Sequence, residues 1–178
     1  MSIDAIADAA AGPFAAACAL LVFAGVAKVR RPVSTRPAAT ALGLPASPVA
    51  VRTLGVFEVT VAVGGLAIGG VVAAIVAAVY AALAIAAWRL FVQAPGTACG
   101  CLGTSDAPVS VAHIVINVVA AVSAVLAIAA GPPLTAVGGG VWARVAFVVL
   151  VGCCASLVAA VLDTLPTIDT RAHEGGTR

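Results

Sequence analysis

The sequence predicts an all-α integral membrane protein, a bundle of about five transmembrane helices. Of its 178 residues, 63% are hydrophobic and only 9% are charged, whereas about a quarter of the residues of a soluble domain are charged. The mean hydropathy is +1.20, and the apolar runs approach the length of about 20 residues that crosses a bilayer. The lipid bilayer is therefore its main surrounding, and we expect a multi-pass protein of the plasma membrane. Residues 1–166 form one predicted transmembrane domain, and residues 167–178 form a polar tail that we expect to be disordered.

The first predicted helix covers residues 9–27 and ends at the basic residues Lys28, Arg30 and Arg31. No basic segment precedes this apolar run, in contrast to a secretory signal peptide, so we expect the helix to remain in the mature protein. A basic, proline-containing loop follows over residues 29–47. Within it, residues 37–44 are expected to form a short interfacial turn.

Residues 49–91 form an apolar stretch that is too long for one span at 1.5 Å per residue. We expect two helices with a break in the glycine-rich residues 64–70, because glycine adopts the positive φ angles of a tight turn. The fourth helix is expected to start near Pro108, with Ser105 or Asp106 as its cap, and to run to about residue 130. The fifth runs from residue 141 to about residue 162, ahead of Asp163 and Pro166.

Five basic residues cluster in and beside the first loop without an intervening acidic residue: Lys28, Arg30, Arg31, Arg36 and Arg52. They are too few for a nucleic-acid surface, so no nucleic-acid partner is expected, and they mark a loop on the cytoplasmic side. Two spans separate this loop from the cysteine-containing loop at residues 93–107. The N-terminus is therefore predicted outside, and the cysteine loop and the C-terminus inside.

The strongest chemical signal is Cys99-Gly100-Cys101. Two thiols separated by one glycine can close a small, strained disulfide, and strain makes such a bond easy to exchange. A position before a helix N-terminus also favours the reactive thiolate. A structural disulfide and a site for a soft metal ion are the alternatives. Because the loop offers only two sulfur ligands, we predict no metal site.

Two polar residues of the fourth helix and one carboxylate of the second accompany this pair. His113 and Asn117 lie one helical turn apart, and His113 is a candidate proton shuttle for thiol exchange, with an interhelical hydrogen bond as the alternative. Glu58 is an intramembrane carboxylate, which is costly enough to need a partner or a cavity. Arg52 or Lys28 is the expected counter-ion, and the alternatives for Glu58 are helix packing and proton handling.

The remaining thiols are Cys18, Cys153 and Cys154. Cys18 lies in an alanine-rich run and is interpreted as a packing residue. Adjacent residues on a helix point about 100° apart, so Cys153 and Cys154 cannot readily bond to each other. Packing is the favoured interpretation for them, and exchange with Cys18 or another partner is the alternative.

Several of these features together resemble a known family. They are the run from Leu21 to Lys28 followed by a basic loop, the segment from Ala41 to Pro45, Glu58 in the second helix, and the segment from Cys99 to Gly103. This pattern resembles the MauE family of methylamine utilisation proteins, within the DoxX-like group of small helical membrane proteins, over roughly residues 14–130. Family members typically carry Phe where this chain has Leu102.

The resemblance implies a role in maturation of a disulfide-containing exported enzyme, methylamine dehydrogenase in the namesake case, together with a thioredoxin-like partner. The first hypothesis is thus a membrane thiol-disulfide oxidoreductase in which Cys99 and Cys101 exchange with a thioredoxin-fold protein, and electrons pass to or from a quinone or a second cysteine in the bundle. The second is a non-catalytic membrane scaffold or assembly subunit with a structural cysteine pair.

Overall fold

The computed structural model describes residues 3–98, 100, 108–129, 132–133 and 140–175. Within this part of the chain, five helices are long and apolar enough to span a membrane, so the predicted fold class is confirmed and the protein is a multi-pass membrane protein. The helices are α1 (Ile3–Arg30), α3 (Pro48–Ile68), α4 (Val71–Gln93), α5 (Val111–Leu126) and α7 (Val141–Gly175). The short helix α2 (Arg36–Ala41) follows α1, and the 3₁₀ turn η1 (Ala127–Ala129) extends α5.

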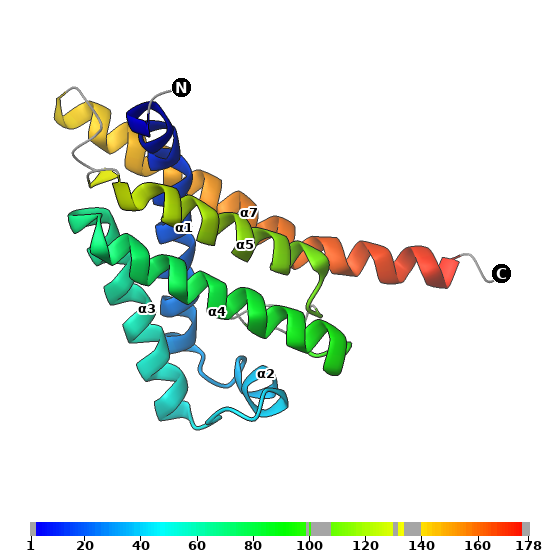
Figure 1. The fold of residues 1–178 in the computed structure, drawn as a ribbon. Helices are drawn as coiled ribbons and strands as arrows, with labels where there is room; N and C mark the ends of the chain where they lie inside the picture. The colour runs from blue at the N-terminus through cyan, green and yellow to red at the C-terminus, as the bar shows by residue number, and fades with distance from the viewer. Residues whose placement is uncertain (1–2, 99, 101–107, 130–131, 134–139, 176–178) are drawn as a thin grey trace.

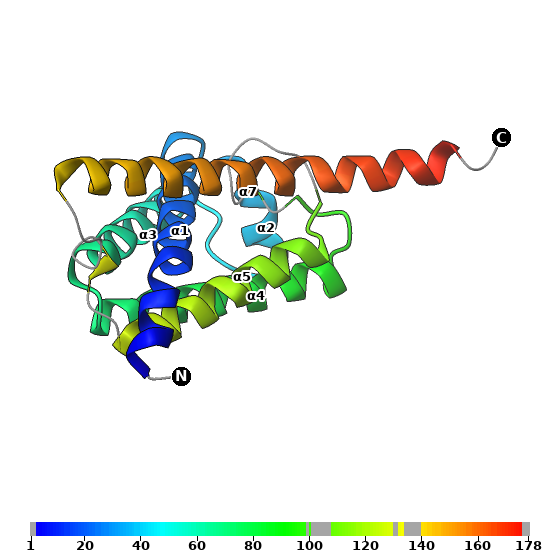
Figure 2. The same ribbon diagram turned by 90° about the horizontal axis from the view of Figure 1, so that it is seen from above.

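Helix α1 lies in the middle of the bundle and packs against α3, α5 and α7, while α4 packs against α3 and α5. Figure 1 shows α4 and α5 side by side and α1 passing behind them. In both views the C-terminal half of α7 projects beyond the other helices (Figures 1 and 2). The protein is therefore a compact group of four helices with a fifth laid against α1.

The apolar stretch after the first loop divides into α3 and α4 at Gly69 and Gly70, inside the predicted break. Both glycines have positive φ angles, 65° and 50°, which L-residues with a side chain rarely adopt. The Gly69 amide donates to the carbonyl oxygen of Gly65 and closes the last turn of α3. The expected short turn in the first loop is also present, as α2.

Two separate apolar clusters hold the bundle together. The larger is centred on α1, α3 and α4 and includes Phe14, Leu21 and Val76. The smaller joins α2 to the end of α4 and the segment before α5, through Ala38, Leu90 and Val109. The second cluster fixes the first loop against the end of α4 and the segment that leads into α5.

Two predicted helix boundaries are wrong. The fourth transmembrane helix begins at Val111 with Ser110 as its N-cap, and Pro108 instead forms an isolated antiparallel bridge with Ala98. A capping box at Ser110 satisfies the first amides of α5, which explains the later start. Ser105 and Asp106, the caps that we expected, lie outside the described residues.

The fifth helix runs to Gly175, past the predicted end near residue 162 and into the tail that we expected to be disordered from residue 167. Helix propagation costs little once an apolar span has formed the nucleus. The polar residues after Asp163 therefore extend α7 rather than ending it.

Candidate functional site

The Cys-Gly-Cys segment is described at its central residue. Cys99 and Cys101 lie outside the described residues, but Gly100 between them is buried, with a φ angle of 59°. The segment is closed at its base by the bridge between Ala98 and Pro108 and by a 3.2 Å hydrogen bond from the Val109 amide to the Thr97 carbonyl.

Gly100 is held against the loop that follows α1. The Thr35 hydroxyl donates to the Gly100 carbonyl oxygen at 3.1 Å, and Thr35 is itself only 8% exposed. A Cβ atom on Gly100 would lie 2.2 Å from the Ser34 carbonyl oxygen, far inside van der Waals contact. Only glycine fits here, and the peptide between the two cysteines is clamped to Ser34 and Thr35. The cysteine segment and the basic first loop thus lie at the same end of the bundle, as the count of two intervening spans requires.

His113 and Asn117 occupy the first turns of α5, close in sequence to the cysteine segment. The Ser110 backbone amide donates to His113 Nδ1 at 3.2 Å, and Ser110 Oγ lies 3.0 Å from the same nitrogen. An acceptor Nδ1 assigns the proton of a neutral ring to Nε2. His113 is 7% exposed, and it caps the helix whose N-terminus follows the cysteines. The Asn117 side-chain amide donates to the His113 carbonyl oxygen at 2.7 Å, so it makes a local bond within α5.

Glu58 is paired with Lys28 and not with Arg52. The Lys28 ammonium donates to Glu58 Oε2 at 2.8 Å, and the two side chains are 2% and 0% exposed. Arg52 is exposed on another face of α3. Of the two counter-ions expected for Glu58, the one 30 residues away in sequence is therefore correct and the one on the same helix is wrong. Arg52 lies six residues from Glu58, and neighbours on a helix face are three or four residues apart.

A close contact between two glycines makes room for this ion pair. A Cβ on Gly25 would lie 2.6 Å from the Gly55 carbonyl oxygen, and one on Gly55 would lie 2.5 Å from the Gly25 carbonyl oxygen and 3.0 Å from Lys28 Cβ. Helices α1 and α3 run in opposite directions (Figure 1), and side chains lean toward the N-terminus of their own helix. Lys28 and Glu58, each three residues after its glycine, therefore lean toward each other across the contact.

Glu58 uses only one of its two carboxylate oxygens. Among the described residues, Oε1 is a buried side-chain oxygen without a hydrogen-bond partner. In the same core, the Tyr80 hydroxyl donates to the Ala17 carbonyl oxygen at 2.6 Å. Tyr80 therefore bonds to the backbone of α1, and the buried ion pair consists of Lys28 and Glu58.

The other thiols are free and separate. Cys18 is fully buried in the main apolar cluster. Cys153 and Cys154 are exposed on α7, so the interpretation that they pack inside the chain is wrong, because α7 turns this face away from the other helices. Within the described part of the chain, no group of three His, Cys, Asp or Glu residues is placed to hold a metal ion.

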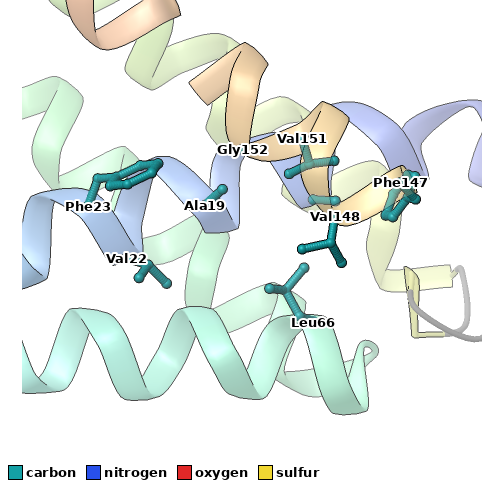
Figure 3. A pocket seen from close by; sticks show the side chains of 9 residues that line it. Ala19, Val22, Phe23, Leu66, Phe147, Val148, Val151 and Gly152 are labelled. Carbon is teal, nitrogen blue, oxygen red and sulfur yellow. The ribbon is translucent and has the colours of Figure 1, made fainter. Parts of the chain in front are cut away.

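An apolar pocket of about 200 Å³ lies between α1, α3 and α7. Figure 3 shows side chains of all three helices around it, among them Val22, Leu66 and Val148. Its lining residues are Ala15, Ala19, Val22, Phe23, Leu66, Phe147, Val148, Val151 and Gly152. None of these side chains can donate a hydrogen bond. The side-chain lining of the pocket is therefore wholly apolar.

Several of these residues gave no signal that we used in the sequence. Thr35 is one of many threonines, Tyr80 is the single tyrosine in an apolar span, and Gly25 and Gly55 are two of 18 glycines. The parallel spacings Gly-x-x-Lys and Gly-x-x-Glu, at residues 25–28 and 55–58, are a pattern that could have indicated the pair but was not used.

The family model for methylamine utilisation protein MauE matches residues 7–130, which run from the first turns of α1 past the end of α5 and include the cysteine segment. No curated protein and no solved structure matches the chain. The match covers well over half of the sequence, and the chain therefore belongs to the MauE family of methylamine utilisation proteins.

Proposed function

We propose that this protein is a membrane thiol-disulfide protein in which Cys99 and Cys101 exchange with a partner of the thioredoxin fold. The observation that carries the proposal is the clamp on Gly100. A buried glycine with positive φ, held by Thr35 and without room for a Cβ, fixes the peptide between the two thiols against the first loop. A fixed peptide between two thiols limits the distances and angles at which the two sulfur atoms can meet. This restriction supports a role of the pair in disulfide exchange.

The proposed reaction is an exchange without an external oxidant. A thiolate of one protein attacks the disulfide of the other and forms a mixed disulfide, and one sulfur leaves as a thiolate. The second thiolate of the attacking protein then breaks the mixed disulfide. One protein ends with a disulfide and the other with two thiols, so the two electrons and the two protons balance between them.

Membership of the MauE family suggests a role in methylamine utilisation. Within that role, the substrate that we propose is an exported enzyme that needs disulfides to mature, and the thioredoxin-fold protein is the exchange partner. His113 supports this proposal as a positioning residue. It caps α5 directly after the cysteine segment, where the positive end of the helix dipole stabilises a nearby thiolate.

Sidedness is part of the proposal. Arg30, Arg31, Arg36 and Arg89 lie near the helix ends at which Gly100 is clamped, and basic loops favour the cytoplasmic side. This side is opposite to the one on which an exported enzyme keeps its disulfides, so we propose that only the exchange with the thioredoxin-fold partner takes place at this end. Labelling of intact cells with a membrane-impermeant thiol reagent, before and after reduction, tests the side. Labelling of Cys99 or Cys101 in intact cells would place the pair outside.

The exchange itself is tested by trapping. Cys101→Ser and, separately, Cys99→Ser should each leave one thiol of the pair, capture a mixed disulfide with the partner, and abolish function. Cys153→Ala and Cys154→Ala are matched controls, because both residues are exposed on α7, and they should leave capture unchanged. If neither serine variant captures a partner and both keep function, the scaffold hypothesis replaces this one.

A further inference from the structure

The Lys28–Glu58 pair offers chemistry that thiol exchange does not use. Both side chains are nearly inaccessible and they meet at 2.8 Å in the contact between α1 and α3. Ionisable groups inside a membrane are expensive, and they persist mostly where they have a function. Two apolar residues of similar volume would pack these helices at lower cost.

The carboxylate is only half satisfied. Oε2 accepts the hydrogen bond from Lys28, whereas Oε1 is buried and has no hydrogen-bond partner among the described residues. A buried ion pair repays the cost of desolvation only when its remaining lone pairs are also satisfied. A proton on Oε1 removes the carboxylate charge and with it most of the desolvation cost of Glu58. One oxygen thus accepts from Lys28, and the other can take up a proton.

Lys28 is placed to remain charged when Glu58 is neutral. It lies in the last turn of α1, together with Arg30, where the carbonyl end of the helix favours a cation. Its four-carbon side chain can carry the ammonium group from the core toward the membrane surface. Release from Glu58 therefore leaves the ammonium with a second favourable position.

We propose that Glu58 is a proton-carrying site inside the membrane, which takes a proton from water onto Oε1 and returns it, with Lys28 as counter-ion of the unloaded carboxylate. The step adds one proton to a carboxylate to give a carboxylic acid, and no electrons move. This site is independent of the cysteine pair, so its failure and the failure of thiol exchange can be told apart.

The groups around Glu58 support this assignment. Helices α1 and α4 pack against α3. Besides Lys28, α1 carries Cys18, and α4 carries Tyr80, whose hydroxyl proton is already donated to a backbone carbonyl. Arg52 on α3 is exposed. Among the described residues where α1, α3 and α4 meet, Glu58 is the one with a buried side-chain oxygen that has no hydrogen-bond partner and can accept a proton.

A hydrophobic carbodiimide tests the proposal, because such reagents modify protonated carboxyl groups in apolar surroundings. In the full chain in lipid nanodiscs, peptide mass spectrometry should locate the modification at Glu58. The labelling rate should fall by about tenfold per pH unit once most of the carboxyl is ionised. Glu58→Gln should lose the modification.

Two variants of Lys28 sharpen the test. Lys28→Gln removes the counter-ion, so Glu58 should be labelled rapidly at every pH, which also shows that the reagent reaches the site. Lys28→Arg can occupy both carboxylate oxygens and should slow labelling at least tenfold. A wild-type protein that is not labelled at Glu58, or is labelled independently of pH, while Lys28→Gln is labelled rapidly, overturns the proposal.

Infrared spectroscopy gives a measurement that does not depend on the Lys28 variants. The wild-type protein should show a carboxylic-acid C=O band that grows as the pH falls and shifts in heavy water, and the isosteric Glu58→Gln protein should lack it. Identical band sets in the two proteins from acidic to alkaline pH also overturn the proposal.

Discussion

Gly100→Ala should be strongly destabilising, because it adds three separate costs at one residue: backbone strain, a steric clash and the loss of a hydrogen bond. Alanine at a φ angle of 59° is disfavoured by roughly 1–2 kcal/mol. Its Cβ would lie 2.2 Å from the Ser34 carbonyl oxygen, and relieving such overpacking costs roughly 1–3 kcal/mol. The movement that relieves it also breaks the Thr35 hydrogen bond, worth roughly 1 kcal/mol. These contributions predict a loss of roughly 3–6 kcal/mol.

The chain offers a matched control in the same loop. Gly96 also has a positive φ angle, 86°, but a Cβ there would meet no atom within 4 Å. Gly96→Ala should therefore cost only the roughly 1–2 kcal/mol of backbone strain. Thr35→Val removes the hydrogen bond while keeping the side-chain shape, and should cost roughly 1 kcal/mol.

The assay is unfolding in mixed detergent micelles, followed by the helical circular dichroism signal, together with the rate of partner capture by the Cys101→Ser variant of each protein. We expect the loss of stability to be largest for Gly100→Ala and smaller for Gly96→Ala and Thr35→Val, with the wild type the most stable. Partner capture should be slowest for Gly100→Ala. Equal losses for Gly100→Ala and Gly96→Ala would refute the reasoning, because they would mean that Gly100 does not rest on Ser34.

Three further predictions concern the helices. Gly25→Ala should separate α1 from α3 and lower stability by roughly 1–3 kcal/mol, whereas Gly12→Ala, where a Cβ meets no atom within 4 Å, should be neutral or slightly stabilising in the same unfolding assay. Glu58→Leu should cost at most roughly 3–5 kcal/mol, the cost of a buried and unpaired ammonium, and less by whatever Lys28 regains when its ammonium moves toward the membrane surface. Glu58→Gln should cost less than Glu58→Leu, because its amide oxygen can still accept from Lys28 in place; equal losses for the two would show that the ion pair is not buried. Ser110→Ala removes the N-cap of α5 and should cost roughly 1 kcal/mol, which a change in amide hydrogen exchange confined to the first turn of α5 would identify.

The parts of the fold that the sequence predicted correctly are those that depend on local composition. The apolar runs predicted five spans because each span must bury its own backbone hydrogen bonds in lipid, whatever its neighbours are. The break between α3 and α4 was predicted for a similar reason, since Gly69 and Gly70 have the positive φ angles of a tight turn. The family resemblance likewise rested on short motifs that can be read without a fold.

Helix ends were predicted less well, because they depend on competing local interactions. Pro108 suits a first helical turn, but the reciprocal bonds of Ser110 and His113 start α5 later. Asp163 and Pro166 suggested an end that the continuing α7 passes. At each of these ends, competing local interactions differ by only roughly 1 kcal/mol, so sequence patterns alone do not determine which residue starts or ends the helix.

The sequence by itself determined that this is a helical membrane protein of the MauE family with a Cys-Gly-Cys segment and a buried carboxylate to neutralise. Only the tertiary structure decided which residues meet. Lys28 and Glu58 are 30 residues apart and Thr35 and Gly100 are 65 apart, and both contacts depend on where glycines let two backbones approach. Such contacts follow from the crossing of whole helices and the placement of whole loops, which no spacing along the chain specifies.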